Sequence, residues 1–69
     1  MIVTWKNTKN TQFELSCADF KMTDEGFEYA DYRGGRHLIL LDGVTSLVVH
    51  RGNERVFKWE AKDGPDKNL

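Results

Sequence analysis

Two apolar runs near the middle of the chain are separated by a turn signal. Residues 38–41 read Leu-Ile-Leu-Leu, Asp42 and Gly43 follow, and residues 44–50 form the second run. An Asp-Gly pair between two such runs favours a two-residue turn with positive φ. We therefore predict that the two runs form a β-hairpin.

Alternating apolar and polar positions predict one strand on each side of this pair. Residues 27–32 and 55–60 each place two aromatic side chains two positions apart, at 27 and 29 and at 57 and 59. The turn at residues 51–54 contains Gly52, and the two glycines at 34–35 precede a strand that begins near Arg36. Glycine suits turns because it adopts left-handed backbone without steric cost. The second half of the chain thus predicts four strands joined by three turns.

The segment 13–22 carries two competing patterns. Its apolar side chains at positions 13, 15 and 17 alternate with polar ones, which is typical of a strand. Thr11 and Glu14 match a helix capping box, and apolar residues also recur at helical spacing. We predict the strand and keep the helix as the alternative. Residues 2–5 form a short leading strand.

The predicted fold is all-β, with five to six strands in an antiparallel meander. An open meander has two exposed edges, so we expect it to curl into a small barrel or sandwich that resembles SH3-like architectures in general outline. Residues 38–41 are apolar on both faces, so Ile39 and Leu41 also need cover, from the N-terminal segment or from another subunit in a homo-oligomer. The predicted core consists of Val3, Trp5, Phe13, Leu15, Cys17, Phe27, Tyr29, Leu38, Leu40, Leu47, Val49, Phe57 and Trp59.

Composition narrows the class of protein. The chain has 69 residues, one cysteine and a net charge of −1, and its longest apolar run is far shorter than a bilayer span of about 20 residues. We expect one domain over residues 1–61, a flexible tail over residues 62–69, no membrane association and a cytoplasmic location, since a lone cysteine forms no internal disulfide. The balanced charge means that any electrostatic function must come from local asymmetry.

Residues that could carry chemistry are sparse. The chain has no glycine-rich phosphate loop, no nucleophile motif and no set of cysteines and histidines at metal-ligand spacing. Cys17 with His37 or His50 as a base is the only nucleophile arrangement, and we favour a buried structural thiol instead. The two histidines alone lack a third metal ligand. We therefore predict a non-enzymatic protein with no cofactor and no metal.

Charge becomes informative when it is placed on the meander, because successive turns alternate between its two ends. One end would contain residues 6–12, 33–36 and 51–55, and the other residues 23–26, 42–43 and the C-terminus. The basic end comprises Lys6, Lys9, Arg33, Arg36, Arg51 and Arg55, opposed by Glu54. The acidic end comprises Asp19, Asp24, Glu25, Asp42, Asp63 and Asp66, relieved by Lys21, Lys62 and Lys67.

The favoured function is a small binding module that docks a protein partner through the basic end. Arginine is common at interfaces because its planar guanidinium binds carboxylates through two parallel hydrogen bonds. The alternative is a nucleic-acid-binding small barrel in which the same arginines contact phosphates and Tyr32 stacks on a base. An alternative to both is that the segregation of charge has no function and is partly chance, since exposed turns carry charge in many proteins. In size and composition the chain is similar to many phage and prophage accessory proteins, which often bind a host protein.

Overall fold

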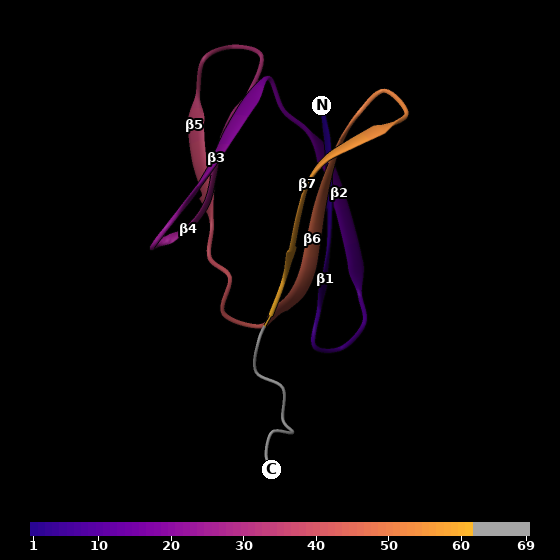
Figure 1. Cartoon of the computed structure of the whole chain (residues 1–69). Coiled ribbons are helices and arrows are strands. Elements are labelled where there is room, and N and C mark those ends of the chain that lie inside the picture. The colour runs from indigo at the N-terminus through magenta and orange to yellow at the C-terminus, as the bar shows by residue number, and fades with distance from the viewer. Residues whose placement is uncertain (62–69) are drawn as a thin grey trace.

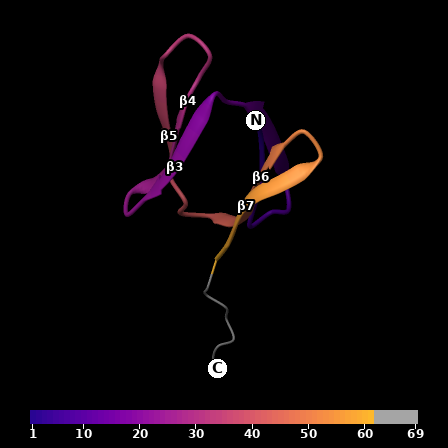
Figure 2. The ribbon, with the colours of Figure 1, turned by 45° about the horizontal axis from the view of Figure 1, so that its top comes forward.

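The computed structural model describes residues 1–61, and within them the chain is all-β. The strands are β1 (Ile2–Asn7), β2 (Gln12–Ser16), β3 (Asp19–Thr23), β4 (Gly26–Ala30), β5 (Arg36–Ile39), β6 (Val44–Arg51) and β7 (Glu54–Glu60). They form two antiparallel sheets, of order β2-β1-β6-β7 and β3-β4-β5, which are separate layers in Figures 1 and 2. The predicted flexible tail, with the charged residues assigned to it, lies outside the described residues.

The segment 13–22 is extended, so the strand prediction is confirmed, but it contains two strands instead of one. β2 ends at Ser16 and β3 begins at Asp19 in the other sheet. Cys17 still donates its N–H to the carbonyl of Met1 beside β1, at 2.9 Å, whereas Ala18 donates to Ala30 of β4, at 2.8 Å. The chain therefore changes sheets between residues 17 and 18, which makes the total seven strands and not five or six.

The hairpin predicted around Asp42 and Gly43 is wrong. β5 pairs with β4 and β6 pairs with β1, so the two runs lie in different sheets. Val44 donates its N–H to Leu41 across the turn at 3.0 Å, and positive φ occurs at Gly43 (83°) but not at Asp42. This is the pattern of a type II turn, whose twist does not match that of paired strands and so separates them. The turns at 31–35 and 52–53 do join paired strands, as predicted.

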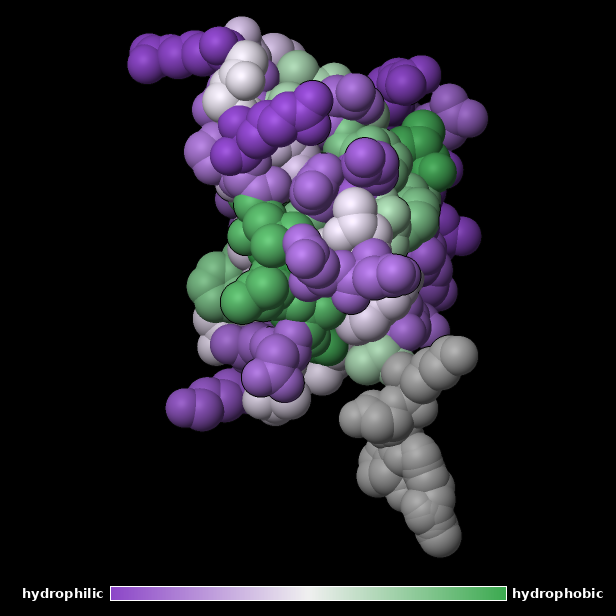
Figure 3. Space-filling model, turned by 90° about the vertical axis from the view of Figure 1, so that its left-hand side faces the viewer, coloured by the Kyte–Doolittle hydropathy of each residue, from purple (hydrophilic) through white to green (hydrophobic). Residues whose placement is uncertain are grey.

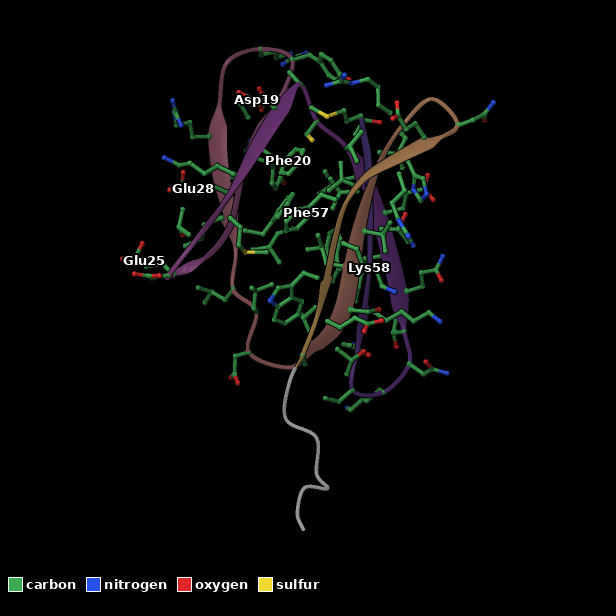
Figure 4. All side chains as sticks on the ribbon, in the orientation of Figure 1. Asp19, Phe20, Glu25, Glu28, Phe57 and Lys58 are labelled. Atoms are coloured by element: carbon green, nitrogen blue, oxygen red, sulfur yellow. The ribbon has the colours of Figure 1, made fainter. Side chains whose placement is uncertain are left out.

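The core lies between the two sheets. Its fully buried side chains are Val3, Cys17, Phe27, Leu47 and Val49. Phe27 is the largest of them, and its ring lies 5.5 Å from that of Phe20 in the same sheet and 6.5 Å from that of Phe57 in the other sheet. Figure 4 shows Phe20 and Phe57 pointing toward each other between the layers. Phe20 was not among the predicted core residues, because the change of sheet at residue 18 also changes which positions point inward.

Three predicted core residues are exposed. Leu38 is 43% exposed and Leu40 is 64% exposed, whereas Ile39 and Leu41 pack against the core. The error follows from the hairpin prediction, which would have placed Leu38 opposite Leu47, whereas pairing with β4 turns the even-numbered positions outward. Phe13, another predicted core residue, is 42% exposed and stacks on Trp5 with ring centres 5.4 Å apart.

The two sheets remain open. The strands of residues 1–61 do not close into a barrel, and an SH3-like architecture is not confirmed. β2 and β7 are the edges of one sheet, and β3 and β5 are the edges of the other. In the part of the chain that the structure describes, no helix is able to cross a membrane.

Candidate functional site

The loop between β4 and β5 is fixed by the side chain of Asp31. Its Oδ1 accepts hydrogen bonds from the backbone N–H groups of Arg33, at 2.9 Å, and Gly35, at 2.8 Å, and its Oδ2 accepts one from His37 Nε2 at 2.9 Å. The hydrogen bond from His37, followed by those from Gly35 and Arg33, lowers the pKa of Asp31 below its ordinary value. Arg33 is therefore carried by a loop whose backbone has a defined shape.

His37 connects this loop to the core. It lies directly across from Tyr29 of β4, and the two rings stack with centres 4.9 Å apart. Tyr29 packs in turn against the buried cluster. The other histidine, His50, lies in the other sheet and lines its outer face. In residues 1–61 no three potential metal ligands gather into a site.

The amino terminus adds a positive charge beside the same loop. The α-ammonium group of Met1 donates to the carbonyl of Cys17 at 2.9 Å and to Tyr32 Oη at 3.0 Å. The ring of Tyr32 nevertheless stays 68% exposed. The contact joins the β4–β5 loop of one sheet to the residue that precedes β1 of the other sheet.

The second arginine-bearing loop is the β6–β7 hairpin. Arg51 pairs with Glu54 across a two-residue turn in which Gly52 has a φ of 61°. A shift of register beside His50 places Arg55 opposite that histidine. Figure 1 shows this hairpin and the β4–β5 loop at the same end of the molecule, near the amino terminus. We call this region the arginine end and define it by Arg33, Arg36, Arg51 and Arg55.

The four arginines share an end but not a face. Arg33 lies in a loop and Arg51 ends β6 at its hairpin, whereas Arg36 and Arg55 lie in the strands just below. Arg36 lines a groove of about 240 Å³ on the outer face of the β3-β4-β5 sheet, and Arg55 lines one of about 370 Å³ on the outer face of the other sheet. Among residues 1–61, none of the four makes an ion pair.

The two lysines assigned to the basic end lie at the opposite end. Lys9 is in the β1–β2 turn, where Thr8 donates its N–H to Gly43 at 3.0 Å, and Lys6 is near the same end of β1. Figure 1 shows this turn beside the β5–β6 connection. The physical reason is the change of sheet after β2, which inserts one chain reversal that the sequence pattern did not reveal. The turn before this change of sheet, β1–β2, therefore lies at the opposite end of the molecule from the one predicted.

Asp19 was assigned to the acidic end, and this assignment is wrong. Asp19 begins β3 opposite Ala30 and therefore lies at the arginine end, as Figure 4 also shows, whereas Glu25 lies at the tip of the β3–β4 turn. The arginine end thus contains Asp19, Asp31 and Glu54 beside its basic groups. The segregation of charge is weaker than predicted, and its positive side comes from the four arginines and the amino-terminal ammonium group.

The groove beside Arg36 was not anticipated. Ala30 lies directly between Asp19 of β3 and Arg36 of β5, so a small side chain separates two long ones. In the next pair on the same face of β3 and β4, Lys21 Nζ lies 3.9 Å from Glu28 Oε1. Only knowledge of the strand register would have revealed this arrangement.

Cys17 is fully buried, in agreement with the preference for a structural thiol. Burial is the main cause that raises the pKa of its thiol.

Comparison with known proteins adds no relative: no family model matches the chain, and no curated protein or solved structure matches it significantly.

Proposed function

We propose that this domain is a non-enzymatic binding module whose arginine end docks on an acidic surface of a protein partner. The observation that supports it is that the loops of Arg33 and Arg51, which belong to different sheets, lie at the same end of the molecule, and that neither arginine makes an ion pair among residues 1–61. A guanidinium group without an internal carboxylate can bind an external one through its planar fork.

The loop geometry favours recognition of a defined surface. The backbone at Arg33 is held by the Asp31 carboxylate, and the loop is tied to the core through the stack of His37 on Tyr29. Binding through a loop that is already ordered avoids the entropy cost of ordering it during association. Such preorganisation is useful for a partner with a fixed arrangement of carboxylates.

The nucleic-acid alternative relies on the exposed ring of Tyr32 beside Arg33. Three carboxylates, those of Asp19, Asp31 and Glu54, lie at the same end and would repel the evenly spaced phosphates of a nucleic acid, whereas a protein surface can place its carboxylates opposite the arginines alone. Binding to phosphates would also be weak and strongly dependent on salt for a protein of nearly balanced charge. We therefore favour the protein partner.

The chain contains a matched control for this proposal. Lys9 occupies the β1–β2 turn, where Asn7 Oδ1 accepts hydrogen bonds from the N–H groups of Lys9 and Thr11, each at 2.9 Å. Asp31 holds Arg33 and Gly35 in the same pattern. Reversal of charge at Lys9 therefore tests a similar loop at the opposite end of the molecule.

The experiment is affinity capture from a native extract with three baits, namely the wild type, Arg33→Glu/Arg51→Glu and Lys9→Glu. We expect one dominant partner to be retained by the wild type and Lys9→Glu and lost by the double variant. Retention by the double variant would refute the arginine end as the interface. Titration with single-stranded DNA and RNA at low and physiological salt tests the alternative, which absence of binding at low salt would remove.

A further inference from the structure

β5 is an open edge of the smaller sheet. It pairs with β4 on one side, and no other strand in residues 1–61 lies against it. Figure 1 shows it at the outer margin of the molecule. Strand edges carry unpaired N–H and C=O groups that can pair with a strand of another chain. The features of β5 that face solvent therefore decide what could add to it.

Hydrogen-bond alternation identifies the free backbone groups. Asp31 donates its N–H to Gly35 at 2.9 Å, in the same register that pairs Tyr29 with His37 and Phe27 with Ile39. Because bonded and non-bonded pairs alternate in an antiparallel ladder, the backbone groups of Arg36 and Leu38 point away from β4. These groups are available to a further strand.

The exposed side chains along this edge and just past its end form an apolar pair bracketed by opposite charges. Leu38 and Leu40 are 43% and 64% exposed. Arg36 begins β5, Leu40 follows its last residue, and Asp42 lies in the turn that leaves the sheet; all four positions are exposed. Figure 3, which views the molecule from this side, shows an apolar area with hydrophilic residues above and below it.

Two copies of this segment have complementary side chains when they run antiparallel to each other. If a second β5 runs antiparallel with the register centred on Ile39, Leu38 lies opposite Leu40 of the second copy. Continued past the end of β5, the same register brings Arg36 toward Asp42 in the turn of the second copy, twice by symmetry. Apolar pairs across antiparallel strands and nearby side chains of opposite charge each stabilise the pairing, and a two-fold axis makes both sets of contacts equivalent.

We propose that the chain forms a two-fold homodimer through β5, which joins the two β3-β4-β5 sheets into one continuous sheet. The interface buries the leucine pair and satisfies the free backbone groups of the edge. It assigns Arg36 to the contact between copies and leaves Arg33 and Arg51 accessible. The proposal does not depend on the function proposed for the arginine end, which in the dimer rests on Arg33, Arg51 and Arg55 because Arg36 belongs to the contact between copies.

The charges at the two ends of the molecule favour the same orientation. Antiparallel pairing places the arginine end of one copy beside the opposite end of the other. That end carries Asp42 in the β5–β6 connection and Glu25 at the tip of the β3–β4 turn, both exposed. Complementary potentials of this kind guide association and disfavour a parallel arrangement.

The test is sedimentation equilibrium of the wild type, Arg36→Asp, Asp42→Arg and an equimolar mixture of the two variants. Either substitution alone opposes like charges at both symmetric positions, so we expect the dimer dissociation constant to rise at least about tenfold. The mixture restores opposite charges in a heterodimer, which should recover the affinity of the wild type. Rescue by mixing also demonstrates that both variants are folded.

A matched pair of apolar substitutions locates the edge. Leu40→Lys should abolish the dimer, whereas Val56→Lys, at a comparably exposed position on edge strand β7, should leave it intact. A wild type that stays monomeric up to about 1 mM overturns the proposal, because association of that strength would be negligible. Failure of the mixed variants to associate, or loss of the dimer in Val56→Lys alone, also overturns it.

Discussion

Gly26 offers the sharpest test of how the smaller sheet is held together. It begins β4 with a φ of 150° and is buried. A Cβ added there would lie 2.4 Å from the carbonyl oxygen of Ile39 in β5 and 3.3 Å from the side chain of Leu38. We therefore predict that Gly26→Ala strongly destabilises the domain, because both the backbone angle and the space are suited to glycine.

The magnitude follows from two contributions. An L-residue forced into a sparsely populated positive-φ region costs about 1–3 kcal/mol. The contact at 2.4 Å is with backbone, which cannot rotate away, so β4 and β5 must separate locally, and the total should reach about 3–5 kcal/mol. A domain of this size is stabilised by roughly 3–9 kcal/mol at about 0.05–0.15 kcal/mol per residue. The variant should therefore be close to unfolding in the absence of denaturant.

Gly43→Ala is the matched control. Gly43 also has a positive φ, 83°, but a Cβ there meets nothing within 4 Å. Urea unfolding followed by fluorescence of the half-buried Trp5 and Trp59 measures both variants. The difference between them isolates the clash with the Ile39 carbonyl. If the two substitutions cost the same within about 0.5 kcal/mol, the reasoning about close approach of the strands is refuted.

Two further predictions concern Asp31 and Cys17. Because the folded state lowers the pKa of Asp31, its contribution to stability is present above the unfolded pKa and is lost as the pH falls through the folded value. The wild type should therefore be more stable than Asp31→Asn at neutral pH, and this difference should shrink as the pH falls below the ordinary pKa of an aspartate. Urea unfolding at several pH values measures it, and a difference in urea midpoint that does not change with pH would contradict the prediction. The Cys17 thiol is fully buried with a raised pKa, so a thiol reagent should label the native protein at least about a hundredfold more slowly than the urea-unfolded chain, and equal rates would contradict its burial.

Local patterns were sufficient to predict most of the strands. Alternation identified β4 and β7, an apolar run identified β6, and the glycines at 34 and 52 marked the β4–β5 and β6–β7 hairpins. These signals are reliable because side-chain periodicity and positive φ are properties of a few neighbouring residues. Burial of Cys17 followed from the same alternation in the first third of the chain.

Pairing of strands was not predictable in the same way. Asp42 and Gly43 satisfy the composition of a hairpin turn, and only the sign of φ at Asp42 distinguishes a hairpin from a turn that separates strands. That sign is determined by the contacts of the strands on both sides. Because of the incorrect pairing, Leu38 and Leu40 were predicted to lie in the core, whereas both are exposed. A change of partner strand changes which positions point inward.

The two changes of sheet, at residues 17–18 and 40–43, explain both proposed surfaces. They leave β5 without a second neighbour, and they bring the arginine loops of different sheets to one end. If both proposals hold, the two-fold axis through β5 directs the two arginine ends in opposite directions. The dimer would then bind two partner molecules independently, so Leu40→Lys would halve the mass of the complex without weakening each contact, whereas Arg33→Glu/Arg51→Glu would abolish the contacts and preserve the dimer.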